Sequence, residues 1–454
     1  MKATNTVFPV VKDAFWLRLI INMKEGWNLW LREPDDPELF GGSVLGRIMI
    51  PGGKRLLAAA MDIPSFYYLI QVPAAWWPYQ ALPKIHSSEV PELNLPEGWW
   101  CPVLRVMAMG FTHAVKLSMV VHRTIMRRAS SMDRLVLRVQ ELKDTEEPTE
   151  LPGYGLVVDD TTVIGLEEHR EILERFIKLY KAEVKRALRV NVHKEQKLST
   201  EPIIAIGYEI GGPEAQIKRK PSALKKLEDE TSRIRKRGYA STEDMEEVIG
   251  KWIFVMIVRR PLLSIVKNVY VWLRQKVSRV KNRALWQMVK EELETLEDLA
   301  PIMIAEMRRE KSPIVWASDA SNWGAGVVYS DHNERGQKFL SNMDRFSQRK
   351  EWKEVISMAW KWQEHINTGE ARANRMAVTA DSTSRMGGRP RQSLFVIDSS
   401  AAGGALKKGR SSSKTLNPVL KRTAAEALFD RLYMEILQVP SAIMPADGAS
   451  RGTA

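Results

Sequence analysis

Stretches of apolar residues in the first half of the chain predict short strands. Residues 7–22 form two such stretches around a turn. Residues 58–71 predict a strand that meets a turn or a short helix at Asp62. Residues 153–165 place arms rich in β-forming residues on both sides of the pair Asp159–Asp160. That pattern predicts a β-hairpin with carboxylates at its bend.

Two further segments have apolar residues at helical spacing. The run 111–127 predicts one helix. A second helix is indicated by a repeat that places an apolar residue on the same face at every turn, at Ile172, Phe176, Tyr180, Val184 and Leu188. The resulting order of strand, helix, hairpin, helix and strand is typical of a small antiparallel sheet backed by helices.

The composition changes near residue 213, where a dense basic segment begins. Its cations are Lys218, Arg219, Lys220, Lys225, Lys226, Arg233, Arg235, Lys236 and Arg237. A solvated helical face and a phosphate-binding surface explain this segment equally well. The residues from Ser241 to Asp244 have the form of a capping box and predict a helix start. We expect that helix to end at Pro261 and further helices to occupy 262–309.

A third pattern begins near residue 311. A strand is predicted from Ile314 to Asp319, and 323–330 returns antiparallel to it. Helices are predicted over 370–386 and 417–432. The Ser-, Gly- and Lys-rich residues 399–415 resemble a linker, but apolar strands precede them directly. We therefore interpret them as loop and short helix inside a compact domain.

The composition is that of a folded protein with a basic surface. The 454 residues are 44% hydrophobic and 27% charged, which indicates two or three globular domains. The formal net charge is +13 and the sequence pI is about 9.6. Such an excess of positive charge favours a polyanionic partner, and nucleic acid is a better candidate than a membrane surface. The positive charge also increases solubility.

The cysteine count and the apolar runs bear on the compartment. Cys101 is the only cysteine, so no disulfide framework or thiolate zinc site is predicted. No apolar run has the length of a membrane span, and the N-terminal stretch has no cleavage-site pattern. We predict an intracellular protein, cytoplasmic or nuclear, with no membrane partner.

Seven acids, in two sets far apart in the chain, are the candidate chemical groups. The first set is Asp62, Asp159 and Asp160, and the second is Asp319, Glu370, Asp398 and Asp447. Two carboxylates side by side at a hairpin bend repel each other unless a cation joins them. Carboxylate oxygens suit Mg²⁺, which usually keeps substrate phosphates among its ligands.

The motifs around the first set, taken in order, resemble those of reverse transcriptases of retroelements, of the gypsy or DIRS type, which carry a fused RNase H domain. Met61-Asp62 through Tyr67 is similar to the first palm motif, and Val157-Val158-Asp159-Asp160 matches the Tyr-x-Asp-Asp box. Met109-Gly110-Phe111 is similar to the template-positioning motif. The segments 206–210 and 259–264 resemble the primer-grip hairpin and the connection region.

The resemblance implies a role for each of these residues. Asp62 and Asp159 would hold two Mg²⁺ ions, with Mn²⁺ as an alternative, and Asp160 would support them. The remaining residues would bind the nucleotide or the template: Lys12 and Arg18 the triphosphate, Tyr67 the sugar, Gly110 a base pair, and Lys197 as the basic residue before the next strand. Alone, Lys12 and Arg18 would be ordinary surface charges and Tyr67 a core aromatic.

The second set resembles the acids of RNase H. Asp319 lies in a strand and hairpin, Glu370 at a helix start, Asp398 at the end of a buried strand, and Asp447 in a box similar to Asn-Pro-Ala-Asp. Four such carboxylates would bind two Mg²⁺ for hydrolysis of RNA in an RNA–DNA hybrid. The basic stretch 407–410 would contact phosphate, or form a flexible loop.

Four positions depart from the family pattern without removing a metal ligand. They are Val157 for Tyr, Ser65 for an acid, Ala108 for Pro and Met444 for Asn. They keep open a second hypothesis, a decayed or domesticated relic that binds nucleic acid without catalysis. A third hypothesis, an RNA-directed RNA polymerase, is opposed by Tyr67 and by the RNase H-like region.

The resemblance implies an α+β fold in three parts. Fingers and palm would occupy 1–212, a mostly helical thumb and connection 213–310, and an RNase H-like domain with a mixed five-stranded sheet 311–454. The predicted function is RNA-directed DNA synthesis with RNase H cleavage. The expected partners are an RNA template, a DNA primer, the RNA–DNA hybrid and dNTPs. No protease, integrase or zinc-knuckle pattern is visible, so we expect a fragment or processed product of such an element.

Overall fold

The computed structural model describes residues 3–11, 17–24, 26–144, 150–275, 279, 281–331, 352–384 and 388–453. These residues form two compact units. The first contains residues 1–41 and 55–206, and the second contains residues 42–54 and 207–454. None of the described helices combines the length and the apolar character that crossing a bilayer requires.

The first unit is built on a five-stranded sheet with the strand order β6-β7-β8-β3-β9. Its strands are β3 (Leu56–Asp62), β6 (Gln140–Glu141), β7 (Gly153–Val157), β8 (Asp160–Leu166) and β9 (His193–Ser199). The pairs β7–β8, β8–β3 and β3–β9 are antiparallel, as predicted, whereas β6 adds to β7 in parallel. The seven residues of β3 are all buried.

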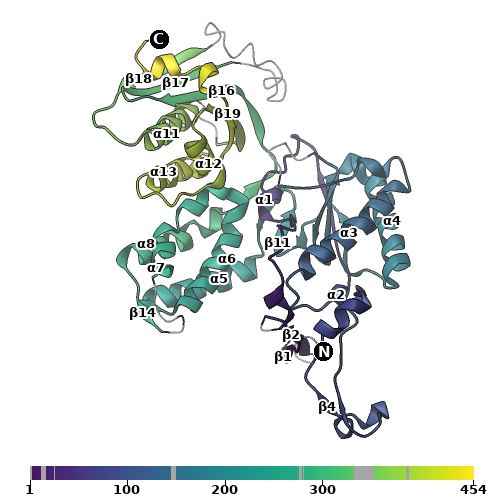
Figure 1. Ribbon diagram of the computed structural model, residues 1–454. Helices are drawn as coiled ribbons and strands as arrows, with labels where there is room; N and C mark the ends of the chain where they lie inside the picture. The colour runs from purple at the N-terminus through teal and green to yellow at the C-terminus, as the bar shows by residue number, and fades with distance from the viewer. Residues whose placement is uncertain are drawn as a thin grey trace. The chain divides into compact units, whose positions relative to one another are not determined.

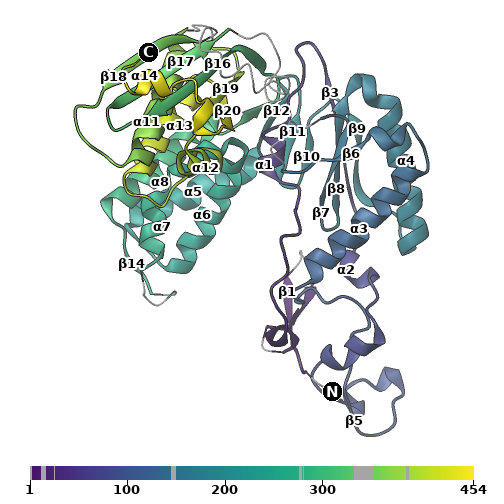
Figure 2. The ribbon, with the colours of Figure 1, turned by 45° about the horizontal axis from the view of Figure 1, so that its top comes forward.

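Two long helices pack side by side against this sheet (Figures 1 and 2). They are α3 (Ala114–Ser131) and α4 (Arg170–Leu188). Both helices were predicted, because their apolar residues recur at intervals of one turn. Met119 and Phe176 from the helices bury their side chains with Met61 and Leu156 from the sheet in one core. This packing fixes the strands whose ends carry the first acid set.

The remaining elements of the first unit are short. Hairpin β1–β2 pairs antiparallel, as predicted for 7–22. The bounds are β1 (Thr6–Val11), β2 (Leu17–Asn22), η1 (Trp27–Trp30), α2 (Phe66–Leu69), η2 (Ala74–Tyr79), β4 (Ile85–His86), η3 (Ser87–Glu89), η4 (Pro91–Leu93), β5 (Trp99–Trp100), η5 (Val136–Arg138), η6 (Glu167–His169) and β10 (Ile203–Ala205).

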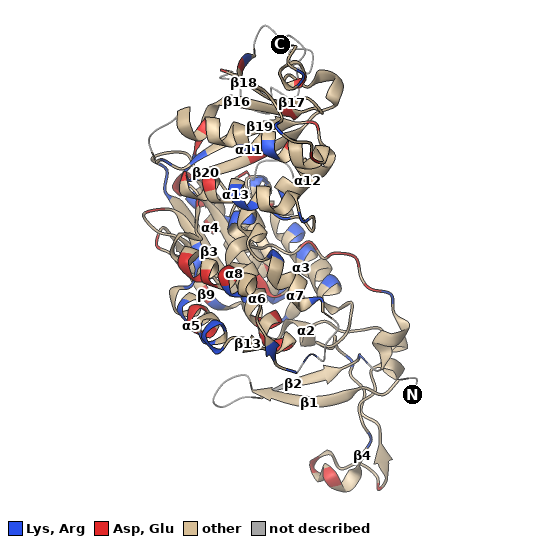
Figure 3. Ribbon diagram, turned by 90° about the vertical axis from the view of Figure 1, so that its left-hand side faces the viewer, with Lys and Arg blue, Asp and Glu red and all other residues tan. Residues whose placement is uncertain are grey.

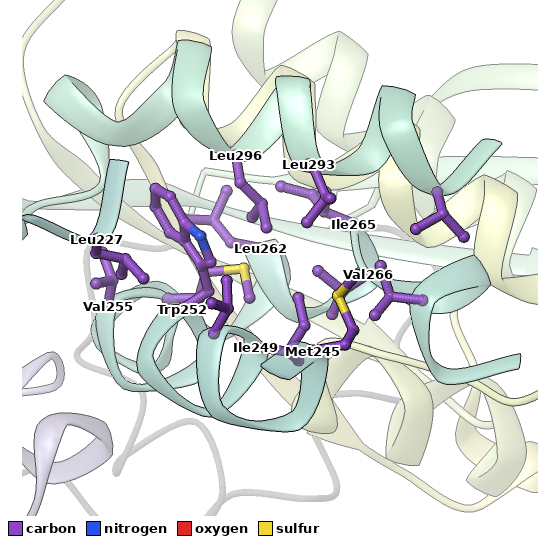
Figure 4. Packing of buried hydrophobic residues seen from close by; sticks show 14 of the residues in the cluster. Leu227, Met245, Ile249, Trp252, Val255, Leu262, Ile265, Val266, Leu293 and Leu296 are labelled. Carbon is purple, nitrogen blue, oxygen red and sulfur yellow. The ribbon is translucent and has the colours of Figure 1, made fainter. Parts of the chain in front are cut away.

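The second unit begins with helices and short strands. Their bounds are α1 (Gly42–Leu45), β11 (Tyr208–Gly211), β12 (Gln216–Arg219), α5 (Pro221–Arg237), β13 (Tyr239–Ala240), α6 (Thr242–Met256), η7 (Ile257–Ser264), α7 (Lys267–Leu273), β14 (Arg283–Ala284), α8 (Gln287–Leu299), η8 (Ala300–Ile302) and β15 (Ala305–Glu306). Trp252 and Met245 of α6 pack against Leu293 and Leu296 of α8 in the core of this region (Figure 4).

The start of α6 was predicted correctly, but its end was not. The Ser241 hydroxyl accepts a hydrogen bond from the Asp244 backbone N–H, and the Asp244 carboxylate accepts one from the Ser241 backbone N–H, so the capping box is present. The α-helix already ends at Met256, five residues before the expected stop at Pro261. The chain continues as η7, which is interrupted at Arg259 by non-helical backbone angles.

The C-terminal part of the second unit is a mixed five-stranded sheet with the order β18-β17-β16-β19-β20. The strands are β16 (Glu310–Ala320), β17 (Gly324–Ser330), β18 (Lys353–Ala359), β19 (Arg391–Ile397) and β20 (Leu432–Gln438). β16, β17 and β18 pair antiparallel, and β19 and β20 continue the sheet in parallel. The predicted α+β class, with two five-stranded sheets and a helical region in the described residues, is confirmed.

Both faces of this sheet are covered. The helices are α11 (Ile366–Ser384), α12 (Ser400–Lys408), α13 (Leu416–Phe429), η10 (Ser441–Ile443) and α14 (Asp447–Ser450). Trp316 packs with Val378 of α11, whereas its neighbour Ala317 packs with Ala449 of α14, as side-chain alternation along a strand requires. A Cβ on Gly326 would lie 2.4 Å from the Ser450 nitrogen, so only glycine lets α14 approach this closely.

A sandwich of two guanidinium groups around one ring joins the helical region to this sheet. Arg259 and Arg309 lie over the Tyr433 ring at 3.9 and 4.0 Å from its centroid. Arg259 also donates to the carbonyls of Ala427 and Leu432. Arg309 donates to the carbonyls of Gly46 and Ile48. The two regions therefore share buried contacts within one unit.

Candidate nucleic-acid-processing sites

The first acid set is assembled at the end of the sheet of the first unit. Asp62, the last residue of β3, lies directly opposite Asp160, the first residue of β8. The predicted hairpin is present, with Val157 opposite Asp160 and the bend at Val158–Asp159. The structure thus brings Asp62 together with two adjacent acids that lie 97 and 98 residues later in the chain.

Two of these acids, Asp159 and Asp160, have raised pKa values. Burial, together with the charges of Asp62 and Asp160, raises the pKa of Asp159 to about 6. Burial and the Asp62 charge also raise the pKa of Asp160. The backbone N–H of Ile63 donates to the Asp159 carbonyl at 3.0 Å and ties the bend to the end of β3. A cation placed among these carboxylates would relieve their repulsion.

A basic residue that the sequence patterns did not single out, Lys194, lies beside these acids. Its Nζ lies 3.3 Å from Oδ2 of Asp62, and its side chain is 72% exposed. The predicted residue, Lys197, lies within β9 instead of before a strand, and it is exposed. The Lys194 charge lowers the pKa of Asp160 and so opposes the rise that burial and Asp62 cause.

A buried polar network supports the hairpin from behind. His122 of α3 is hydrogen-bonded through Nδ1 to the Val158 carbonyl at 2.7 Å and through Nε2 to the Tyr180 hydroxyl at 2.9 Å. Thr161 of β8 bonds both His122 and Tyr180. Burial lowers the pKa of His122 to about 4, so its ring is neutral at pH 7. No local motif around His122 indicated this role.

The network holds a strained turn. Val158 has a φ of 55°, a region that a β-branched residue adopts only as an outlier. Strain of this kind costs about 1–3 kcal/mol and persists where surrounding contacts impose it. The contacts here are the bond from His122 and the Val158 N–H, which points to Sδ of Met119 at 3.3 Å. The bend carrying Asp159 is therefore held in one conformation.

Of the predicted nucleotide-binding residues, Tyr67 interacts with the hairpin, whereas Gly110 packs against β2. Tyr67 is half-buried, and burial followed by the Asp159 charge raises its pKa. A Cβ on Gly110 would lie 1.8 Å from the Ile21 carbonyl oxygen, so this glycine is needed for packing against β2. Asn28 fixes the same turn by donating to the Gly110 carbonyl and accepting from Thr112.

Two other predicted residues cannot be placed in the site. Lys12 lies outside the described residues. Arg18 lies in β2 opposite Val10, and its side chain is not among those described. Their proposed contact with the triphosphate stays a prediction.

The second acid set is assembled on the C-terminal sheet. Asp319 comes from β16, Glu370 from the first turns of α11, and Asp398 directly follows β19. Oxygen atoms of these three residues lie within 4.8 Å of one another. Within the described residues, this is the group of three side chains whose ligand atoms lie close enough together to hold one metal ion. Asp447 does not belong to the group, although it begins α14 close by.

Burial dominates the electrostatics of this set. Asp319 and Glu370 are 4% and 6% exposed. Burial, and then the neighbouring carboxylates, raise the pKa of Asp319 to about 6 and that of Glu370 to about 9. The Ser450 hydroxyl donates to Asp319 and opposes that rise. Asp447 contributes its charge to Asp319, while Arg451 pairs with Asp447 at 2.8 Å.

The donor set suits a hard divalent cation. Three carboxylates converge, and within the described part of the chain Oε2 of Glu370 is buried without a hydrogen-bond partner. A buried acceptor without a donor is costly, and a cation would satisfy it. Oxygen-only ligands favour Mg²⁺ or Mn²⁺ over softer metals.

The first basic segment runs from β12 into the mixed-charge helix α5, and the second lies at the end of α12. In α5, Lys225 pairs with Asp229 and Arg235 pairs with Glu297, so part of the positive charge is neutralised within the protein (Figure 3). Lys408 ends α12, and Gly409 follows with a φ of 70°. A Cβ there would lie 2.0 Å from the Arg260 carbonyl oxygen. The stretch 407–410 is therefore packed against η7, not free.

Comparison with known proteins gives a distant structural likeness. No protein-family model and no curated protein matches the chain. The structure of the foamy viral protease-reverse transcriptase dRH in complex with double-stranded DNA is similar over 96% of this chain and 65% of that one, with 12% identity and a TM-score of 0.48. The foamy viral protease-reverse transcriptase in complex with double-stranded DNA is similar over 96% and 78%, with 13% identity and a TM-score of 0.45. The function proposed below is therefore built on this chain's own residues.

Proposed function

We propose that this chain is an RNA-directed DNA polymerase that also hydrolyses the RNA strand of RNA–DNA hybrids. The observation that supports it is the presence of two separate carboxylate sets, each assembled from distant segments at the end of a sheet. One contains Asp62, Asp159 and Asp160, and the other contains Asp319, Glu370 and Asp398. A single carboxylate set would fit many hydrolases or transferases. The presence of both sets fits the two reactions of the reverse transcriptases with a fused RNase H domain that the sequence motifs resemble.

In the polymerase reaction, the hairpin would position the reacting groups. Asp62 and Asp159 would hold divalent ions, which lower the pKa of an attacking 3′-hydroxyl and neutralise the leaving pyrophosphate. Asp160, opposite Asp62, would keep the local charge negative enough to retain them. Tyr67, beside Asp159, would form a wall under the sugar and exclude a 2′-hydroxyl. His122 and Tyr180 would hold the bend in place.

In the nuclease reaction, Asp319, Glu370 and Asp398 would hold the ions that activate water. The Ser450 hydroxyl would orient Asp319, because it donates to one of its carboxylate oxygens. Asp447 would add negative charge at the edge of this set. The expected substrate is the RNA strand of the hybrid that the first reaction makes.

The test is a pair of assays on the full chain, primer extension on an RNA template and cleavage of a labelled RNA–DNA hybrid. Asp159→Ala should abolish extension and leave cleavage intact, and Asp319→Asn should do the reverse. Asp298→Ala, which replaces an exposed acid of α8 that belongs to neither set, is the matched control and should change neither activity.

The outcomes separate the hypotheses. No extension with Mg²⁺ or Mn²⁺ would count against a polymerase. Salt-sensitive hybrid binding without turnover, unchanged by Asp62→Asn, would support the non-catalytic relic. Loss of both activities in Asp159→Ala would mean damage to the fold instead of to one site.

A further inference from the structure

A cavity of about 220 Å³ lies beside the second acid set. Its walls come from the two chain segments that carry two of the acids. Ser321 and Asn322 follow Asp319 by two and three residues, and Gly369 directly precedes Glu370. A ligand in this cavity would therefore lie next to the bond that the acids act on.

The aromatic wall of the cavity is fixed in place. The Trp360 indole N–H donates to the Ser321 carbonyl at 3.0 Å. The Trp360 backbone N–H donates to the Trp323 carbonyl at 2.9 Å. The indole can thus offer a ring face or edge without the entropy loss that ordering a free side chain would require.

The polar wall carries acceptors and amides. Glu364 lines the cavity, and Arg372 holds its carboxylate through an ion pair. Asn322 and Gln363 line it as well, and both side chains are exposed enough to turn toward a ligand. No lysine or arginine lines the cavity in the described part of the chain. A phosphate would meet a carboxylate there, so the cavity is not an anion site.

Size and chemistry together indicate a planar heterocycle with N–H donors. The cavity volume is below the range of about 300–1,000 Å³ typical of pockets for drug-sized ligands. It therefore favours a ligand no larger than one nucleobase. Carboxylates accept from the amino group of cytosine, and Asn or Gln amides pair with adenine. Aromatic side chains and amides are the groups with which proteins hold bases that have left the stack.

We propose that this cavity takes one unstacked nucleobase of the strand cut at Asp319, Glu370 and Asp398, with adenine or cytosine preferred to uracil. The inference rests on the nuclease half of the proposed function and adds sequence preference to it. Uracil lacks the exocyclic amino group that Glu364 would accept from, so it forgoes a hydrogen bond that adenine or cytosine would add to the ion pair of Glu364 with Arg372.

The first test maps cleavage of RNA–DNA hybrids in which the RNA positions around the cut are randomised. One position should show a preference of about fivefold or more for adenine or cytosine over uracil, the lower end expected for one good base contact. Gln363→Ala and Asn322→Ala should flatten that preference. Gln392→Ala, an amide on β19 that bonds Glu435, is the matched control and should keep it.

A second experiment tests whether the base must unstack from the hybrid duplex to enter the cavity. A mismatch opposite the preferred position lowers the cost of unstacking, so cleavage there should rise in the wild type and rise less in Gln363→Ala. Uniform cleavage at all bases, or a preference that Gln363→Ala and Asn322→Ala leave unchanged, would overturn the inference while the nuclease assignment stands.

Binding of free nucleosides distinguishes failure of the nuclease assignment from failure of the base site. Saturation-transfer NMR on the full chain, without divalent ions, should show adenosine or cytidine bound more strongly than uridine, with the difference lost in Gln363→Ala. If the chain cleaves nothing but shows this binding, the proposed nuclease fails and the base site stands. Equal or no binding of all three nucleosides would refute the base site regardless of activity.

Discussion

Asp62 and Asp160 face each other as directly opposed partners on β3 and β8. Like charges in that position are destabilising by about 0.2–1 kcal/mol. We therefore expect Asp160→Asn to raise the free energy of unfolding by roughly that amount in urea titrations with a chelator present. Asp298→Asn on α8 should leave it unchanged. An unchanged or lower stability of Asp160→Asn would mean that Lys194 already compensates the pair.

The two acid sets should bind divalent cations independently. Calorimetric titration of the wild type with Mn²⁺ should show two classes of site. Glu370→Gln should remove one class, because it takes an anionic ligand from the buried group that includes Asp319. Asp159→Asn should remove the other. If either variant removed both classes, or neither, the assignment of separate metal centres would be wrong.

The buried His122 should make stability depend on pH in a defined window. Its pKa is lowered to about 4 in the folded protein, against about 6.5 in an unfolded chain. Below pH 6.5 the unfolded state binds a proton that the folded state excludes, so stability falls as the pH drops from about 6.5 to about 4. The loss is at most about 3 kcal/mol.

The measurement is the urea midpoint of the wild type and of His122→Gln at several pH values. Raised carboxyl pKa values, such as that of Asp159, act in the opposite direction and are common to both proteins. The difference between the two proteins should therefore shrink between pH 7 and pH 4.5. Parallel curves would show that His122 does not titrate in this range.

Tyr67 should control sugar selection. Tyr67→Val opens space under the sugar and should increase ribonucleotide incorporation by at least about tenfold, a typical effect of reshaping an apolar wall. Tyr68→Val is the matched control, because the Tyr68 hydroxyl bonds the Leu19 carbonyl instead. Incorporation of dNTPs and rNTPs by each variant is compared in single-nucleotide extension. Unaltered selectivity in Tyr67→Val would remove Tyr67 from the nucleotide site.

Two glycines should respond in opposite ways to alanine. Gly110→Ala forces a methyl group to within 1.8 Å of the Ile21 carbonyl oxygen and should destabilise by about 1–3 kcal/mol. Gly250 lies in the exposed part of α6, and an alanine methyl group there would meet nothing within 4 Å. Gly250→Ala should therefore stabilise by about 0.5–1 kcal/mol. Thermal denaturation of the two variants gives the signs directly.

Local patterns in the sequence predicted local structure well. The arms around Asp159–Asp160 predicted the hairpin because their β-forming residues flank one turn. Ser241 and Asp244 predicted the start of α6 because a capping box acts within one turn of helix. The end of α6 was misjudged because the chain leaves α-geometry before Pro261, at a place where tertiary packing decides.

Contacts between distant segments were harder to predict. The acid sets were grouped through their motifs, and the structure brings six of the seven acids into two groups. Lys194 was missed because a single exposed lysine in a basic chain carries no signal of its own. His122 was missed because its partners, Val158 and Tyr180, lie 36 and 58 residues away. The cavity at Trp360 depends on the bonds from Trp360 to Ser321 and Trp323, which lie 39 and 37 residues away, and has no counterpart in any local pattern.

The ring of Tyr433 between Arg259 and Arg309 has a practical consequence for shortened versions of this protein. A fragment beginning at residue 311 would expose both faces of that ring, and one beginning at 259 would still deprive Arg309 of the carbonyls of Gly46 and Ile48. A stable fragment that contains the C-terminal sheet therefore requires two separate stretches of the sequence, the residues around Gly46 and Ile48 and those from Arg259 onward.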